Sequence, residues 1–107
     1  MKSFNLSTMI KGWFIGDFTP SVLRTRDFEV GLKEYKSGDV EPSHLHKAAT
    51  EITLICSGMV MFNDFVYTKG SIVVVEPGEV VQFKALEDSL TVVVKCPSVL
   101  SDKYILS

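Results

Sequence analysis

Residues 38–58 read GDVEPSHLHKAATEITLICSG, which places two histidines two residues apart and a glutamate five residues after the second. If residues 40–47 are extended, the two-residue side-chain period of a strand puts His44 and His46 on one face. A connection of four residues then brings Glu51, at the start of the next strand, beside both imidazoles. Two imidazoles and one carboxylate suit a divalent transition metal, so the pattern predicts a metal site formed by these three side chains.

Histidines near a glutamate also occur by chance, and many histidines are ordinary surface residues. The chain contains only these two histidines, and they stand at strand spacing between the turn residues Gly38 and Gly58. These features favour a functional site over a chance cluster.

The same residues resemble the first sequence motif of the cupins, which are small antiparallel β-barrels. That motif reads Gly, five residues, His-x-His, three or four residues, Glu, six residues, Gly. All of its positions are filled in this sequence, by Gly38, His44, His46, Glu51 and Gly58. The resemblance implies a cupin barrel with His44, His46 and Glu51 as metal ligands.

The second cupin motif is only partly kept. It reads Gly, five residues, Pro-x-Gly, two residues, His, three residues, Asn, and Gly70 and Gly78 match it. The departures are Glu76 at the proline position with Pro77 one place late, Val81 in place of the fourth ligand histidine, and Ala85 in place of the asparagine. The resemblance covers about residues 28–96 and implies a site with open coordination positions, which binds metal less tightly than a site with four protein ligands.

Composition agrees with one domain spanning residues 1–107. The length is close to the commonest domain size, and 46% hydrophobic residues can build one core. The net charge of -2, without any basic run, predicts no nucleic-acid partner, and no apolar stretch is long enough to span a membrane. The N-terminus lacks the apolar run of a signal peptide, so we expect a soluble, cytoplasmic protein with Cys56 and Cys96 reduced.

Short apolar segments separated by turn residues run along the chain, and no helical apolar stripe of useful length interrupts them. The pattern predicts an all-β, single-domain antiparallel β-barrel or jelly roll of about eight or more strands. The expected strands lie at residues 28–35, 40–47, 51–56, 59–62, 65–67, 71–75, 80–84, 90–95 and 103–106.

Strand phase predicts which side chains line a pocket beside the metal. Counting in twos from Glu51, we expect Thr53 to face inward, and Val81 and Phe83 to form an apolar wall on a later strand. On the strand that contains Phe28, Val30 and Leu32, the same phase places Glu34 in the pocket and Tyr35 on the opposite face. A solvated strand end is the alternative for Glu34.

Three functions are compatible with this pattern. The first is a metal-dependent enzyme using Fe, Mn, Ni, Cu or Zn at His44, His46 and Glu51. The second is a metal-free isomerase or epimerase of a sugar or carbonyl compound, with a histidine as the base. The third is a non-catalytic module that binds a small, sugar-type ligand in the barrel mouth.

The N-terminal segment, residues 1–20, contains the apolar run Gly12–Ile15, which is unusual near a chain end. Such a run either covers the molecule's own sheet or marks an association surface. Small single-domain cupins usually pair, so the resemblance implies a homodimer in which this segment packs on or joins a neighbouring sheet.

Overall fold

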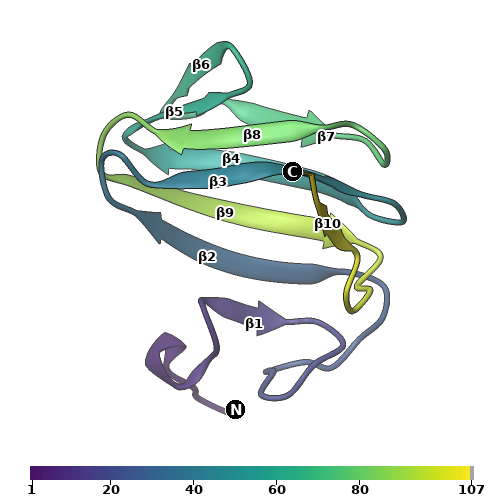
Figure 1. The fold of residues 1–107 in the computed structure, drawn as a ribbon. Helices are drawn as coiled ribbons and strands as arrows, with labels where there is room; N and C mark the ends of the chain where they lie inside the picture. Colours follow the sequence, from purple (N-terminus) through teal and green to yellow (C-terminus); the bar gives the residue numbers. More distant parts are fainter. Residues whose placement is uncertain (107) are drawn as a thin grey trace.

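The computed structural model describes residues 1–106 and shows two facing sheets of five strands each (Figure 1). One sheet has the order β1-β2-β9-β4-β7 and the other the order β10-β3-β8-β5-β6, with antiparallel neighbours throughout. The strands are β1 (Trp13–Ile15), β2 (Glu29–Tyr35), β3 (Val40–His46), β4 (Thr50–Ser57), β5 (Met59–Phe62), β6 (Phe65–Thr68), β7 (Ile72–Val75), β8 (Val81–Ala85), β9 (Ser89–Cys96) and β10 (Lys103–Ile105). The predicted all-β antiparallel barrel is confirmed.

Turn chemistry sets the strand boundaries that the sequence indicated. Asn63 has a φ of 53° and forms, with Asp64, the two-residue turn between Phe62 and Phe65. Gly58 has a φ of 88°, and a Cβ there would lie 2.4 Å from the carbonyl oxygen of Asp88, so glycine alone fits this turn between β4 and β5.

One end of the space between the sheets is filled by apolar side chains. The ring of Phe83 lies with its centroid 4.5 Å from that of Tyr35 and 5.2 Å from that of Phe62. The buried members of this core are Ile55, Val60, Phe62, Val75, Val81, Phe83 and Ala85. Alternation on β4, β5 and β8 directs these residues inward, as strand phase predicts.

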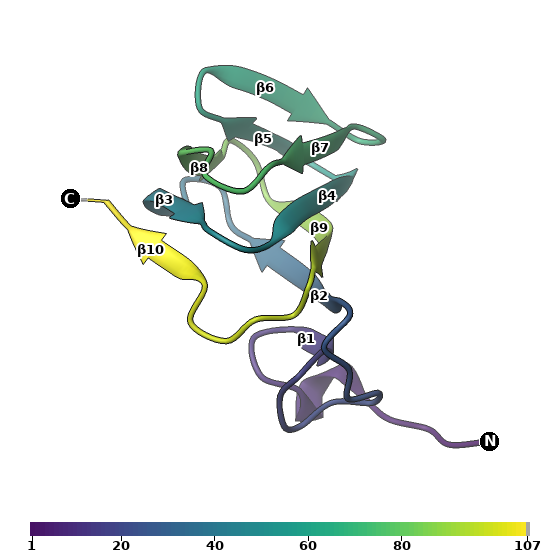
Figure 2. The ribbon, with the colours of Figure 1, turned by 90° about the vertical axis from the view of Figure 1, so that its right-hand side faces the viewer.

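The N-terminal segment begins with a single 3-10 turn, Leu6–Thr8, and then adds β1 to the edge of the first sheet beside β2 (Figures 1 and 2). Trp13 lies opposite Gly31, and a Cβ on Gly31 would approach the indole ring to 2.7 Å. Gly12, with a φ of 83°, brings its backbone so close to Leu32 that a Cβ would lie 1.9 Å from the carbonyl oxygen. The segment thus packs on its own sheet through close contacts that require glycine in the segment, at Gly12, and in β2, at Gly31.

The C-terminal strand β10 pairs with β3, and the loop before it is attached to the β3–β4 connection by Asp102. The carboxylate of Asp102 accepts hydrogen bonds from the backbone N–H groups of Lys47, Ala48 and Ala49 at 3.1, 3.0 and 2.9 Å. Burial opposes ionisation of this carboxyl, but the three N–H donors outweigh it and lower its pKa. The clamp fixes the backbone of the connection between His46 and Glu51.

None of the helical structure in residues 1–106 has the length and apolar character needed to cross a bilayer.

Candidate ligand-binding site

The open end of the space between the sheets holds a cavity of about 350 Å³, within the usual size range of small-molecule pockets. A second cavity of about 290 Å³ adjoins it and shares four of its lining residues, Trp13, His46, Lys95 and Lys103. The larger cavity contains the predicted triad His44, His46 and Glu51, and the structure also places Thr53, Val81 and Phe83 in its wall. One cavity thus brings together six of the seven residues selected from the sequence.

His44 is held in one orientation by its own strand. It is buried on β3, and its Nδ1 lies 2.9 Å from the carbonyl oxygen of Pro42. A carbonyl only accepts, so Nδ1 carries a proton and donates, which leaves Nε2 as the ring nitrogen that faces other partners. The ring is set edge-on to that of His46, with 5.4 Å between centroids.

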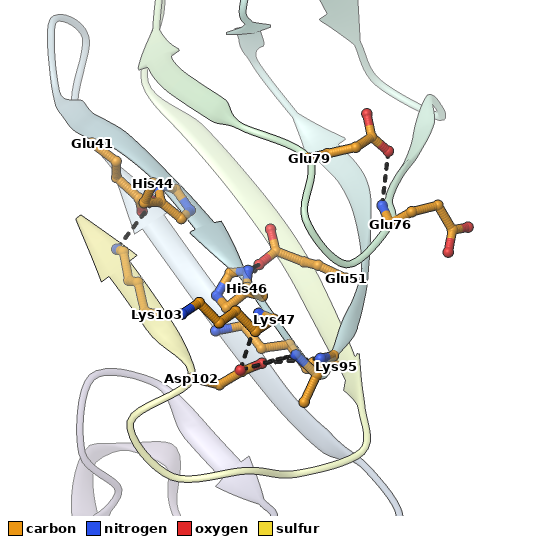
Figure 3. Close-up of polar contacts among 12 residues, drawn as sticks. Glu41, His44, His46, Lys47, Glu51, Glu76, Glu79, Lys95, Asp102 and Lys103 are labelled. Atoms are coloured by element: carbon orange, nitrogen blue, oxygen red, sulfur yellow. Dashed lines mark hydrogen bonds and ion pairs between the residues drawn. The ribbon is translucent and has the colours of Figure 1, made fainter. Parts of the chain in front are cut away.

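His46 is also buried, and its nearest charged neighbour is the carboxylate of Glu51. Its side chain is 5% exposed, and its Nδ1 lies 3.8 Å from Oε2 of Glu51, beyond hydrogen-bond distance (Figure 3). Its Nε2 is buried and has no hydrogen-bond partner among the described residues. Burial, assisted by the positive charge of Lys95, lowers the pKa of His46 to about 4, so the ring is neutral at pH 7.

Glu51 lies in a row of alternating charge across three strands. On β9, Lys95 pairs in register with Glu51 on one side and with Glu29 on the other. Its Nζ lies 4.0 Å from Oε2 of Glu51 and 3.9 Å from Oε1 of Glu29. Burial raises the pKa of Glu51, and the ammonium of Lys95 opposes that rise. The positive charge beside Glu51 therefore comes from Lys95 on the neighbouring strand β9.

Trp13 forms part of the cavity mouth between two lysines. Gly31 leaves room for its indole on the inner side of β2, and the Nζ atoms of Lys33 and Lys95 lie 5.4 and 5.0 Å from its ring centroid. Both distances are within cation–π range. The N-terminal segment therefore supplies a wall of the site, a role that the sequence did not indicate.

On the far side of His44, Tyr35 and Glu41 form a polar pair. The Tyr35 hydroxyl donates to Oε1 of Glu41 at 2.9 Å, and Nζ of Lys103 lies 3.7 Å from Oε2 of the same carboxylate. Burial, together with the Glu41 charge and hydrogen bond, raises the pKa of Tyr35. All three residues line the cavity.

The predicted orientation of β2 is wrong. Glu34 is exposed and lines a separate surface hollow, whereas Lys33 and Tyr35 line the central cavity. The sequence suggested the opposite phase because Val30 and Leu32 are apolar. Leu32, however, lies on the outer side of the sheet, where it lines an apolar hollow with Phe4, Leu6, Met9 and Phe14 of the N-terminal segment and with Val22. The outer face is apolar because that segment covers it.

The side chains of the triad are not arranged as a preformed metal site. Among residues 1–106, no three histidine, cysteine, aspartate or glutamate side chains converge closely enough to hold an ion. Val81 occupies the position of the fourth ligand, and Glu51 has an ammonium beside it. Glu76 and Glu79, the nearest carboxylates in the second motif, are exposed and point away from the histidines (Figure 3).

Thr91 is a further site residue that the sequence did not reveal. It is 1% exposed, lies on β9 between Lys33 of β2 and Ile55 of β4, and lines the cavity. Like Nε2 of His46, its Oγ1 is buried without a partner in the part of the chain that the structure describes. Alternation in the run SLTVVVKC is the only sequence signal that places Thr91 and Lys95 on one face.

A scan against protein-family models finds no match, and no curated protein matches the chain. Several solved structures do match the chain. A Klebsiella pneumoniae protein with a double-stranded β-helix domain is 20% identical over 97% of this chain and 90% of its own, with a TM-score of 0.71. An RmlC-like cupin from Ralstonia eutropha is 20% identical over 78% of this chain and 58% of its own, with a TM-score of 0.61. The DMSP lyase DddQ from Ruegeria pomeroyi is 14% identical over 85% of this chain and 48% of its own, with a TM-score of 0.70. The chain therefore has the cupin fold.

Proposed function

We propose that this cupin barrel binds a small organic molecule in the cavity between its sheets. The observation that carries the proposal is the pair of buried, unpartnered polar atoms in the cavity wall, Nε2 of His46 and Oγ1 of Thr91. A buried polar group without a partner costs on the order of 1–3 kcal/mol, so a folded chain with two of them gains when a ligand supplies the missing hydrogen bonds.

Histidine NMR tests the proposal because the chain has only two histidines. A panel of glucose, gluconate, glucose 6-phosphate and malonate is titrated while the ring signals of His44 and His46 are followed. We expect at least one probe to shift the His46 signals in a saturable manner. Thr91→Val should weaken that probe roughly fivefold, the value of one hydrogen bond of about 1 kcal/mol.

Thr68→Val is the matched control, because Thr68 is exposed on β6. It should bind the probe as the parent chain does. The proposal fails if no probe moves the His46 signals, or if the two threonine variants lose affinity equally.

Proton transfer is a second candidate, favoured by the opposite pKa shifts of His46 and Glu51 in one cavity. Such pairs often divide into base and acid. Neutral His46 would take a proton from the carbon beside a carbonyl. The protonated form of Glu51, which burial favours, would give one to the carbonyl oxygen, forming an enediol as an isomerase or epimerase requires. A neighbouring structure, the DMSP lyase, shows that the fold also carries enzymes.

Solvent exchange tests this candidate directly. Glucose 6-phosphate and fructose 6-phosphate are incubated with the protein in D2O, and deuterium at the carbon next to the carbonyl is measured. Incorporation that disappears in Glu51→Gln would support proton transfer. Binding without incorporation would leave a non-catalytic ligand-binding module.

Metal binding at His44, His46 and Glu51, with Fe, Mn, Ni, Cu or Zn, is the competing proposal. The complete first motif and the Nε2 atom of His44, which faces other partners, favour it, and the ammonium of Lys95 beside Glu51 disfavours it. Elemental analysis after reloading with each ion decides between them, with a His44→Ala, His46→Ala double variant as control. Stoichiometric metal that the double variant lacks would replace our proposal.

We also propose that two copies of the chain pair. The N-terminal segment covers the β2–β9 side of the first sheet, but the outer side of β7, its edge strand, keeps Ile72 and Val74 63% and 50% exposed. Light scattering at micromolar concentration should give twice the chain mass, and Val74→Lys should give the monomer. A monomeric parent chain would contradict this proposal.

A further inference from the structure

The cavity is charged opposite to the chain. The chain has 13 acidic and 11 basic residues, a net charge of -2. The described lining of the larger cavity nevertheless contains four lysines, Lys11, Lys33, Lys95 and Lys103, against two carboxylates, Glu41 and Glu51. Four of the eleven basic residues thus surround one small cavity, and their field attracts anions into it and repels divalent cations.

These lysines reach the cavity from separate parts of the fold, since they lie before β1, on β2, on β9 and on β10. Nζ of Lys33 donates to the carbonyl oxygen of Lys11 at 2.8 Å, which still leaves two donors. For Lys95 and Lys103, the paired carboxylate oxygens lie 3.7 to 4.0 Å away, beyond the reach of a direct hydrogen bond. The ammonium groups therefore have donors available for a ligand.

The acidic residues near these lysines also accept hydrogen bonds from other groups of the fold. Glu41 accepts the Tyr35 hydroxyl at 2.9 Å. In the adjoining cavity, Glu29 accepts the Ser98 hydroxyl at 2.8 Å, and Asp102 accepts three backbone N–H groups.

The geometry points to a small organic anion as the ligand, a carboxylate or phosphate ester whose oxyanion is held by Lys33, Lys95 and Lys103. This inference rests on the proposed function, because it names the class of molecule that enters the same cavity. The neutral part of the ligand meets Nε2 of His46 and Oγ1 of Thr91, so hydroxyl groups are expected on it. Trp13, between Lys33 and Lys95, provides an apolar face beside the anion.

Trp13 is the only tryptophan of the chain and lines both cavities, so its fluorescence reports binding at this place. The probes are inorganic phosphate, malonate, gluconate and glucose 6-phosphate, each compared with sodium chloride at equal ionic strength and with neutral glucose. Phosphate and carboxylate probes form separate arms, which identify the oxyanion. We expect at least one anion to change the fluorescence in a saturable manner, and glucose to bind more weakly.

The decisive variant is Lys33→Met with Lys103→Met, which should weaken the effective anion roughly tenfold or more for each ammonium removed. The matched control is Lys69→Met with Lys84→Met, which removes the same charge from exposed positions on other parts of the barrel and should leave binding unchanged. Loss of the Lys33 hydrogen bond to Lys11 could lower the melting temperature of the double variant. In that case the single variant Lys103→Met is compared with Lys69→Met, because the Lys103 side chain is 41% exposed.

The inference is overturned if every anion acts only as sodium chloride does, if both double variants lose affinity equally, or if glucose binds as tightly as glucose 6-phosphate. In the last case saturable shifts of the His46 signals would still support small-molecule binding, so the two proposals fail separately. Stabilisation by a divalent metal in place of the anions would also overturn it.

Discussion

The two ends of the barrel interior are built on the same strands but for different purposes. On β4, Glu51 lies at the open end among lysines and histidines, while Ile55, two inward positions further along, is fully buried in the apolar core. The closed end is packed with apolar side chains. The open end holds buried titratable groups and unpartnered polar atoms, which lower stability. The barrel interior therefore has its packed core at one end and its buried titratable groups at the other.

The largest effect should come from the closed end. Ile55→Ala removes a side chain with 0% exposure and leaves a cavity, so the free energy of unfolding should fall by about 2–5 kcal/mol. Urea unfolding measures the loss. Leu54→Ala on the same strand removes a side chain that is 38% exposed, and it should cost about 1 kcal/mol or less. Equal losses at the two positions would break the distinction between core and surface on β4.

At the open end, stability should depend on pH through His46. Its pKa is about 4 in the folded chain against 6.5 for an ordinary histidine, so the unfolded chain binds more protons between these values. The contribution of the neutral ring to the free energy of unfolding is therefore fully present above about pH 6.5. It is lost as the pH falls toward 4, and the loss reaches roughly 3 kcal/mol.

Urea unfolding of the parent chain and of His46→Gln at pH 7.5 and pH 4.5 isolates this dependence. Glu51, whose raised pKa acts in the opposite direction, contributes to both proteins and largely cancels in the difference. The parent should lose more stability on acidification than the variant. Identical pH profiles would show that the ring is not held neutral by its surroundings.

The Asp102 clamp should have a smaller effect that is confined to the open end. Asp102→Asn removes the charge and one of the oxygens that accept three backbone hydrogen bonds, so a loss of about 1–2 kcal/mol is expected. Hydrogen exchange should speed up at the N–H groups of Ala48 and Ala49 and remain slow at Ile55. Asp64→Asn in the exposed β5–β6 turn is the control, and equal exchange in both variants would contradict the clamp.

The sequence predicted the closed end and the histidine face well because alternation and turn residues determine both. It located Val81 and Phe83 in the cavity wall, since β8 alternates cleanly between buried and exposed residues. The predicted side-chain orientation of β2 was wrong. Alternation divides a strand into a polar and an apolar face, but it does not show which of the two faces lies inside the barrel. The apolar face of Leu32 turned out to be the outer one, under the N-terminal segment.

The lysines of the cavity were also invisible in the sequence. Lys33 and Lys95 are 62 residues apart in the sequence, and the pairing of β2 with β9 brings them to one face of the sheet. Single lysines at strand positions look like ordinary solvated residues until that pairing is known. The first motif drew attention to a metal, whereas the charge of the site depends on residues outside both motifs.

The smallest predicted effect has the opposite sign. Thr91→Val exchanges a buried hydroxyl without a partner for a methyl group of similar shape, so the ligand-free protein should become more stable by about 1 kcal/mol. Thermal unfolding of the variant and the parent measures the change, with Thr68→Val as the exposed control. Destabilisation would mean that Oγ1 has a partner in solution and that the wall of the cavity is already satisfied. Stabilisation would mean that the open end retains a polar group at a cost to the fold, as expected where a ligand completes the site.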